Sequence, residues 1–270
     1  MAGQLNLGII GVGNLGGALA EGALAAGAAS RVLAADLDTA RLEELAERLG
    51  DRFQPRQAGH VAGGSDVVVV AVKPHIVPSV LPDVDRNLRA GCPLVSVAAG
   101  VTLRTIQASL RPGLPVVRAM PNLAMLVRES ATAMTANDAV SPEQMRTVES
   151  VFKAVGKVYQ VSESQMHAVT GLSGSGPAYV GLVVEGLAAG AVQKGLPPKL
   201  AMAMACQLLQ GSARLLSETG WHPAALKDRV TTPAGTTIAG LRELEIGAVR
   251  GALLSAVEAA SERSEELAGR

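Results

Sequence analysis

The segment VTTPAGTTIAGL, residues 230–241, places four threonines around one proline and two glycines, directly before an apolar repeat with helical spacing. A helix that begins after Gly235 exposes up to four main-chain N–H groups that lack helical partners, and its dipole favours an anion at that end. The hydroxyl groups fit either a simple helix cap or a pocket for a carboxylate. This segment alone leaves both interpretations open.

A second candidate anion site lies near the N-terminus. Gly11, Val12, Gly13, Asn14, Leu15 and Gly16 form the pattern GxGxxG between an apolar run and a helical pattern. In a dinucleotide-binding unit the first glycine permits a tight turn, the second lets the backbone approach a pyrophosphate, and the third lets helix and strand pack closely. This context favours a bound dinucleotide over a tight strand–helix turn with no ligand.

Asp36 ends the next apolar run, about 20 residues after Gly16, where such units carry the residue that contacts the ribose. A carboxylate there can accept a hydrogen bond from the ribose 2′-hydroxyl and would repel a 2′-phosphate. No Lys or Arg follows until Arg41, so the chemistry favours NADH over NADPH. The alternative is an aspartate that only stabilises a turn.

Later apolar runs end in small or polar residues, in AVKPH at 71–75, AAGVT at 98–102 and MPN at 120–122. Ligands of doubly wound sheets bind beyond the carboxyl ends of the strands, and Lys73 faces either the cofactor or solvent. No Ser-His-Asp triad or pair of acids is visible. A hydride donor together with a carboxylate pocket points to reduction of a small carboxylated C=N or C=O compound.

The elements that must position these residues differ between the two halves of the chain. Strand-like runs at 5–10, 31–36, 66–72, 93–100, 115–121, 131–136 and 157–161 alternate with helical patterns. They predict an α/β fold with a Rossmann-like, doubly wound, mostly parallel sheet.

The second half loses the strands and predicts three long helices. They run from about 178 to 194, from Pro197-Pro198 to about 217, and from near 237 with one apolar stripe reaching Val257. We expect a dinucleotide-binding domain at 1–162 and an all-α domain at 163–270 that completes its core with a second copy. The end, ERSEELAGR, is expected to be solvated.

Composition argues against several classes of function. Lys and Arg number 24 and Asp and Glu number 24, so no strong field favours nucleic acid or an anionic membrane. Cys92 and Cys206 form no CxxC or Cys-His cluster, so we expect no metal site and treat both as apolar filler. The apolar stretch 178–192 contains Glu185 and glycines, which favours a buried helix over a membrane span. We therefore expect a soluble, cytoplasmic protein.

Five motifs occur in an order typical of one family. LKDRVTTPAGTTIAGL at 226–241, together with AVKP, AAGVT, MPN and LSGSGPAYV at 172–180, resembles the pyrroline-5-carboxylate reductase family, from about residue 7 to 267. The resemblance implies reduction of 1-pyrroline-5-carboxylate to L-proline with NADH or NADPH, the last step of proline biosynthesis. It also implies a homodimer or a larger homo-oligomer, with active sites between partner subunits.

The same resemblance implies roles for individual residues. Thr237 resembles the hydroxyl that bonds the imine nitrogen of the substrate, Gly235 and Thr236 resemble N–H donors to its carboxylate, and Glu163 resembles a position near the ring. The residues that resemble further cofactor contacts are Val72, Lys73, Pro74, Ala98, Ala99 and Asn122.

Three features differ from the family pattern. NADP-using members tend to carry small or hydroxyl residues in place of Asp36, members often have Asn in place of Ala58, and MPNLAMLVRES at 120–130 replaces the commoner MPNTPALVGEG. Three alternative functions remain: another small-acid imine reductase, a 3-hydroxyacid-type dehydrogenase, and a non-catalytic dinucleotide-binding protein. The dehydrogenase would need a catalytic lysine on the helix that opens the second domain, and no lysine lies between Ser162 and Lys194.

Overall fold

The computed structural model describes residues 5–269, which form two compact units. Unit one extends through Ser175 and resumes at Ala259, and unit two is Gly176–Glu258. The domain division expected between 162 and 163 lies earlier in the chain than this change of unit, and it stays a proposal.

Unit one is built on an eight-stranded sheet with the order β3-β2-β1-β4-β5-β6-β7-β8. Neighbouring strands are parallel except β6 and β7, so the expected mostly parallel α/β sheet is confirmed. The strands are β1 (Asn6–Ile10), β2 (Arg31–Ala35), β3 (Phe53–Pro55), β4 (Val67–Val70), β5 (Leu94–Ser96), β6 (Val116–Met120), β7 (Ser130–Ala136) and β8 (Gly156–Gln160).

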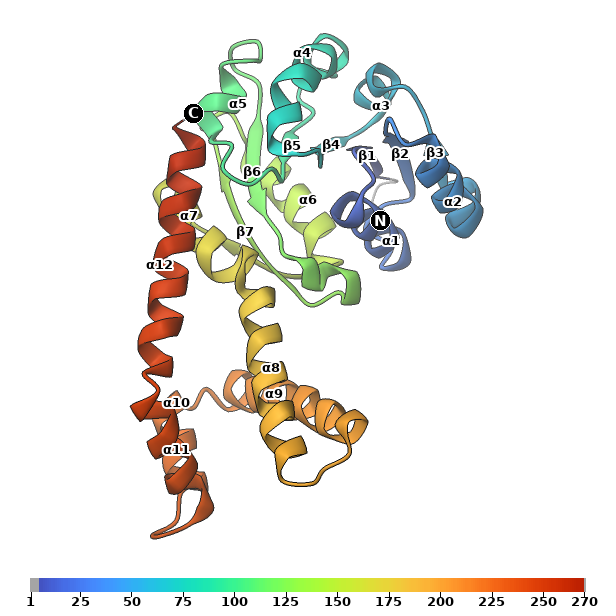
Figure 1. Ribbon diagram of the computed structural model, residues 1–270. Coiled ribbons are helices and arrows are strands. Elements are labelled where there is room, and N and C mark those ends of the chain that lie inside the picture. The colour runs from blue at the N-terminus through green and yellow to red at the C-terminus, as the bar shows by residue number, and fades with distance from the viewer. Residues whose placement is uncertain (1–4, 270) are drawn as a thin grey trace. The chain divides into compact units, whose positions relative to one another are not determined.

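Helices cover both faces of this sheet, which explains why its central strands are apolar on both sides. Of the completely buried residues of β4, Val67 and Val69 belong to one core cluster and Val68 and Val70 to the other. Figure 1 shows the two helix layers on opposite sides of the strands. The first cluster includes α1 (Asn14–Ala25), α2 (Thr39–Leu49) and α6 (Pro142–Lys153), and the second includes α3 (Ala58–Gly64), α4 (Val77–Asn87) and α5 (Leu103–Gln107).

Strand β3 has no counterpart in the sequence prediction. It is three residues long and ends in Pro55, and it lies at the edge of the sheet, where the loss of a main-chain donor is tolerated. Phe53 anchors it in the core with 3% exposure. One aromatic residue among charged neighbours gives no alternating pattern, so the strand is fixed by tertiary packing.

Unit two contains α8 (Gly176–Gln193), α9 (Pro198–Thr219), α10 (Pro223–Val230), α11 (Thr236–Ile246) and the first part of α12 (Val249–Ala268). The expectation of three long helices is wrong in two places. The sequence analysis did not separate α10, and the stripe expected to reach Val257 is interrupted where Ala248 takes a left-handed φ of 51°. Helices α8 and α9 pack through small residues, which include Ala188, Ala201 and Ala205.

Within one copy of the chain α8 is mostly exposed, so the expectation of a buried helix is wrong for the single chain. Ala188 is its one buried residue, and Leu182 is 71% exposed. Among residues 5–269, one helical stretch, Glu163–Gln193, has the length and hydropathy to cross a membrane. An apolar face of this kind needs a partner surface.

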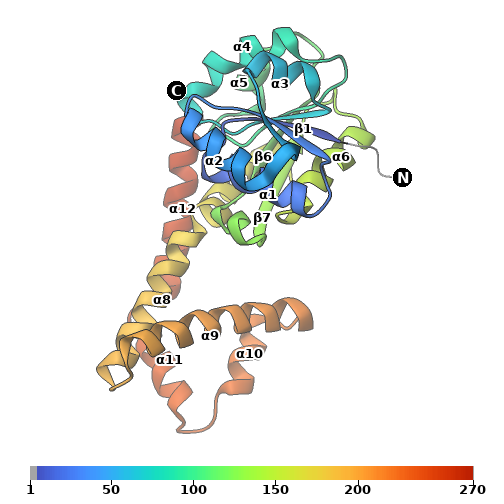
Figure 2. The same cartoon turned by 90° about the vertical axis from the view of Figure 1, so that its right-hand side faces the viewer.

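The C-terminal segment is exposed at most of its described positions, as expected, but one of its residues is buried. Helix α12 continues to Ala268, Ser264 is 3% exposed, and its hydroxyl lies 2.9 Å from Nδ1 of His167. In both ribbon views this end of α12 lies against the rest of unit one (Figures 1 and 2). The sequence gives little sign of this contact because the buried residue is a serine among charged neighbours.

Candidate functional site

The cofactor residues expected from the sequence lie at the carboxyl ends of the parallel strands. Strands β2, β1, β4, β5 and β6 are parallel, so their carboxyl ends face the same way. Strand β1 lies between β2 and β4, which makes this the point where the strand order reverses and where such sheets bind ligands. Gly11 and Asp36 directly follow β1 and β2, and Val72, Ala98 and Asn122 lie two residues after the ends of β4, β5 and β6.

A different feature of the backbone geometry favours glycine at each of the three glycine positions of the GxGxxG loop. Gly11 has a φ of 96°, and a Cβ there would lie 2.7 Å from the carbonyl oxygen of Ala71. A Cβ on Gly16 would overlap the carbonyl oxygen of Gly11. Gly13 caps α1 without a side-chain cap, and no atom lies within 4 Å of its missing Cβ. An open helix start of this kind fits a pyrophosphate.

Asp36 is tied directly to this loop. One carboxylate oxygen accepts a hydrogen bond from the N–H of Val12 over 2.6 Å, and the other accepts one from the N–H of Asp38 over 3.0 Å. The carboxylate therefore holds the loop against the end of β2. It is more than a surface residue in a turn.

Arg41 reaches the same loop, although in sequence it follows Asp36 at some distance. Asp38 caps α2 and places Arg41 in its first turn. From there the Arg41 Nε donates to the carbonyl oxygen of Val12 over 3.4 Å, and Nη1 donates to Glu44 over 2.5 Å. That hydrogen bond lowers the pKa of the Glu44 carboxyl. A cation thus lies beside the expected ribose and phosphate positions.

The strand ends nearer the middle of the sheet combine exposed and buried residues. Lys73 and Pro74 are exposed, whereas Ala98 is 4% exposed. Ala99 packs against the cluster of Met120, Ala133 and Met166. Because residues 98 and 99 are both alanine, no bulky side chain at these two positions covers the backbone of the loop after β5.

Asn122 is positioned by hydrogen bonds through its main chain and its amide group. Its N–H donates to the hydroxyl of Ser130 over 3.1 Å, its Oδ1 accepts from the N–H of Ala124 over 3.1 Å, and its Nδ2 donates to Ser173 over 3.2 Å. In the unusual 120–130 loop, Arg128 adopts a left-handed φ of 61°, at the position where the commoner sequence has glycine.

Arg118 is a residue that the sequence analysis missed. It lies on β6 with 1% exposure, and its Nη1 is 2.8 Å from Oε1 of Glu163. The same Glu163 oxygen accepts from the N–H of Leu103 over 3.1 Å. Nη2 of Arg118 and Oε2 of Glu163 are buried and have no hydrogen-bond partner within the described part of the chain. An arginine inside the apolar run VVRAM was the available signal.

The threonine-rich segment of unit two forms a helix start like that of the glycine loop. Gly235 is the N-cap of α11, no side chain caps it, and the first turn has no acidic residue. Side-chain caps do exist in this chain, on α2, α5, α6 and α10. A capping role for the threonines therefore does not explain the segment.

The turn before α11 is tightly built. The N–H of Gly235 donates to the carbonyl oxygen of Thr232 over 3.0 Å, and Ala234 takes a left-handed φ of 55°. A Cβ on Gly235 would overlap the Thr232 hydroxyl. The hydroxyl of the half-buried Thr237 has no hydrogen-bond partner among residues 5–269.

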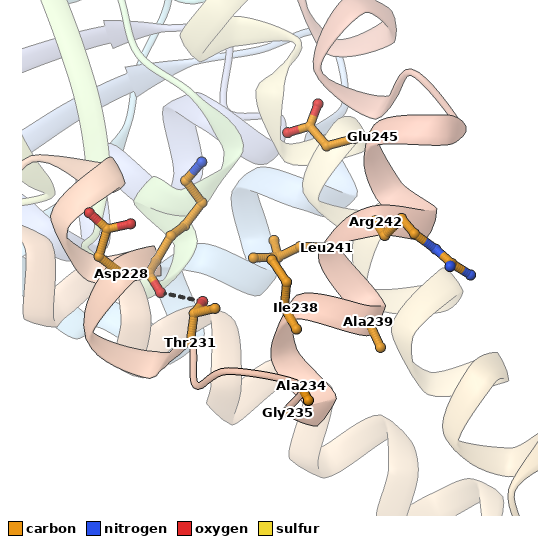
Figure 3. Close-up of a pocket in the computed structure, with 10 residues that line it drawn as sticks. Asp228, Thr231, Ala234, Gly235, Ile238, Ala239, Leu241, Arg242 and Glu245 are labelled. Carbon is orange, nitrogen blue, oxygen red and sulfur yellow. Dashed lines mark hydrogen bonds between the residues drawn. The ribbon is translucent and has the colours of Figure 1, made fainter.

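A cavity of about 700 Å³ lies beside this turn, between the end of α10 and the first turns of α11. Figure 3 shows Asp228 and Thr231 of the α10 side facing Ile238 and Leu241 of α11. The Thr231 hydroxyl is used locally, because it donates to the carbonyl oxygen of Lys227 over 2.7 Å. Gly235 also lines the cavity.

Other chemistry is weakly represented in the described residues. No group of three His, Cys, Asp or Glu side chains there is arranged to hold a metal ion. Cys92 is buried, as expected of an apolar filler, and burial raises the pKa of its thiol to about 12. Cys206 is exposed within the single chain, so the filler expectation is wrong for it there.

Comparisons with known proteins cover almost the whole chain. Residues 163–267 match the family described as pyrroline-5-carboxylate reductase dimerisation, and residues 6–100 match the family described as NADP oxidoreductase, coenzyme F420-dependent. A pyrroline-5-carboxylate reductase of Methanosarcina acetivorans is 42% identical over 263 residues, which cover 97% of each chain.

Two solved structures are similar over a comparable length. A pyrroline-5-carboxylate reductase from Coxiella burnetii is 35% identical with a TM-score of 0.91, over 98% of each chain. A Plasmodium falciparum pyrroline carboxylate reductase with NADP bound is 28% identical with a TM-score of 0.87, also over 98% of each chain.

Proposed function

Because the chain belongs to the pyrroline-5-carboxylate reductase family, we propose that the start of α11 binds and orients its substrate. The protein is an NAD(P)H-dependent oxidoreductase that reduces 1-pyrroline-5-carboxylate to proline in proline biosynthesis. The observation that carries the proposal is the helix start at Gly235, which has no side-chain cap, together with the unpartnered hydroxyl of Thr237.

The substrate carboxylate is assigned to the main-chain N–H groups of Gly235 and Thr236, and the N–H of Gly235 would have to share or exchange its present hydrogen bond to the carbonyl oxygen of Thr232. The helix dipole favours negative charge at this position, and no acidic side chain of the first turn competes for it. The tight approach of Gly235 to Thr232 leaves no room for a larger residue. Anion binding here needs no lysine or arginine in the first turn.

Thr237 is the catalytic residue of this proposal. Its hydroxyl hydrogen-bonds the ring nitrogen while the neighbouring carbon is reduced. A hydroxyl group is too weak an acid to protonate an imine by itself at neutral pH. Thr237 therefore orients a ring that arrives protonated, or relays a proton from water.

We propose that the dinucleotide pyrophosphate lies on the N–H groups of the glycine loop, Gly11–Gly16, and the ribose beside Asp36. When bound, NAD(P)H supplies the hydride. Further contacts are proposed for Val72, Lys73, Pro74, Ala98, Ala99 and Asn122. Two observations support this assignment: the space around the Cβ position of Gly13 is open, and no side chain caps the start of α1.

NADH is the proposed preferred donor. The Asp36 carboxylate, held by Val12 and Asp38, places negative charge where a 2′-phosphate would lie. Arg41 offsets part of that charge because its guanidinium reaches Val12, so we expect a preference and not exclusion. The Plasmodium falciparum relative binds NADP, and the choice in this chain depends on this local balance.

Glu163 is proposed to lie near the substrate ring, where its charge favours a protonated nitrogen. Arg118 and the N–H of Leu103 both bind Oε1, which fixes the direction of the carboxylate. Oε2 has no partner within the described residues.

The chain carries a dimerisation domain, and we propose a homodimer or a larger homo-oligomer. The exposed apolar residues of α8 and α9 supply the surface, among them Leu182 and Leu208. This use of α8 also argues against a membrane span at Glu163–Gln193. We propose a cytoplasmic enzyme on the same ground.

The experiment that tests this function follows the reducing hydrogen. NADH that carries deuterium at the transferable position is incubated with 1-pyrroline-5-carboxylate and the enzyme, and proline is analysed by mass spectrometry. We expect one deuterium on the ring carbon that was part of the C=N bond. Unlabelled proline, or no proline, would contradict the proposal. A panel of 3-hydroxyacids with oxidised cofactor tests the dehydrogenase alternative, and we expect no turnover with it.

A further inference from the structure

The loop between β5 and α5, Ala98–Thr102, is contacted by the last turns of α12. Gly100 is buried and has a φ of 74°. A Cβ on Gly100 would lie 3.2 Å from the Cβ of Leu267 and 3.8 Å from the carbonyl oxygen of Ser264. The backbone of the loop and the surface of α12 therefore touch with no side chain of the loop between them.

The rest of the loop is fixed by other parts of unit one. Ala98 and Val101 belong to the core cluster of α3, α4 and α5, and Ala99 packs against the cluster of Met120, Ala133 and Met166. Thr102 caps α5 by accepting a hydrogen bond from the N–H of Thr105 over 3.1 Å. Gly100 is the point at which the loop meets α12.

The end of α12 is itself held in place. The Ser264 hydroxyl lies 2.9 Å from Nδ1 of His167 on α7 (Met166–Val169), and Ser264 is 3% exposed. Met166, the neighbour of His167, is fully buried and belongs to the cluster of Met120, Ala133 and Met166 against which Ala99 packs. Helix α7 is thus bonded to α12 through His167 and contributes Met166 to the cluster that supports the loop.

We propose that Ser264 and Leu267 are positioning residues for the cofactor, because they hold the Ala98–Thr102 loop in the shape that receives it. This inference rests on the proposed cofactor contacts of Ala98 and Ala99. A loop that is already ordered loses less conformational freedom when a ligand binds, so its affinity is higher. The residues act through the loop and touch neither substrate nor cofactor.

The first test compares Leu267→Gly, which removes the Cβ that faces Gly100, with Glu265→Gly, which makes the same backbone change at an exposed neighbour on the same turn. The dissociation constant of NADH is measured by its fluorescence, and KM for each reactant and kcat are measured separately. Leu267→Gly should raise the NADH dissociation constant and the KM for NADH about three- to tenfold relative to Glu265→Gly. KM for 1-pyrroline-5-carboxylate and the unfolding temperature should stay at the Glu265→Gly values, because Leu267 is 48% exposed.

The second test uses two glycines with matched backbones. Gly100 and Gly91 have φ angles of 74° and 76°, so an added Cβ strains both alike, but nothing lies within 4 Å of the Cβ position at Gly91. Gly100→Ala must push α12 away by a few tenths of an ångström and should weaken NADH binding. Gly91→Ala should bind NADH as the wild type does.

Hydrogen exchange of the nucleotide-free protein supplies a readout that needs no cofactor. Faster exchange of the amides of 98–102 in Leu267→Gly than in Glu265→Gly supports the inference. Equal exchange of these amides in the two variants, or wild-type NADH affinity in both Leu267→Gly and Gly100→Ala, overturns it. A wild-type protein that binds neither NADH nor NADPH would instead contradict the proposed function.

Discussion

The carboxylate of Asp36 accepts a hydrogen bond from the main-chain N–H of Val12 over 2.6 Å. This contact links the end of β2 to the glycine loop, so one side chain sets both the shape of the loop and the charge beside the ribose position. A substitution at Asp36 therefore changes two properties together. A test of cofactor choice has to separate them.

Asp36→Asn removes the charge and keeps an oxygen that can accept from Val12. We expect the ratio of kcat/KM for NADPH to that for NADH to rise by about tenfold, equivalent to about 1.4 kcal/mol. The control is Asp38→Asn, which removes a nearby charge, keeps an effective helix cap and does not touch Val12. Steady-state kinetics with both nucleotides measures the ratio. A wild type that uses NADPH better than NADH would show that Asp36 has been misinterpreted.

The Arg118–Glu163 ion pair should behave as a coupled unit in unfolding experiments. Removal of one partner of a buried pair leaves an uncompensated charge, and Arg118→Met should lower the free energy of unfolding by about 3 kcal/mol. We choose the lower end of the usual range because the Glu163 side chain is 35% exposed.

The matched variant for this pair is the double substitution Arg118→Met with Glu163→Gln, followed by urea denaturation. It removes both charges, so it should be more stable than Arg118→Met alone. Additive losses would mean that the two side chains do not compensate each other.

Arg128 lies in a conformation that favours glycine, with a φ of 61°. Arg128→Gly should relieve about 1–2 kcal/mol of backbone strain in the folded state. Glycine also makes the unfolded chain more flexible, which should cancel about half of that stabilisation. We expect a net increase in stability of about 0.5–1 kcal/mol, measured by urea denaturation. Glu129→Gly is the control; Glu129 is not among the positive-φ residues, so its substitution should destabilise. Equal effects of the two substitutions would argue against strain at 128.

Thr237→Ala should lower kcat by roughly ten- to a hundredfold. The loss of one positioned hydrogen bond should reduce the stabilisation of the transition state by about 1–3 kcal/mol. NADH affinity should hardly change, since the glycine loop belongs to unit one and Thr237 to unit two. Steady-state kinetics and NADH fluorescence measure the two effects.

Thr231→Ala is the matched control for Thr237→Ala. The Thr231 hydroxyl is bonded to the carbonyl oxygen of Lys227, so its loss should lower stability by about 1 kcal/mol and leave kcat nearly unchanged. Equal loss of kcat in both variants would mean that the segment has only a structural role.

Local patterns in the sequence predicted most of the fold. The valines of β4 and the GxGxxG loop are readable because strand burial and a strand–helix turn each depend on neighbouring residues. The helix start at Gly235 is readable for the same reason. The doubly wound, mostly parallel sheet follows because parallel strands joined by helices leave few arrangements, but the sequence did not predict the order of the eight strands.

The features that sequence analysis missed depend on distant contacts. Arg118 and Glu163 are 45 residues apart, and neither position shows its partner in a single sequence. Ser264 is buried by its packing in unit one, although its neighbours read as a charged surface. The break at Ala248 needs a left-handed residue that the apolar spacing does not show.

The most direct test of the central claim is the spectrophotometric rate of NADH and NADPH oxidation with 1-pyrroline-5-carboxylate as the second substrate. We predict substrate-dependent oxidation of both nucleotides, with the higher kcat/KM for NADH and with proline formed in equal amount. No substrate-dependent oxidation of either nucleotide by a folded, dimeric protein would contradict the account.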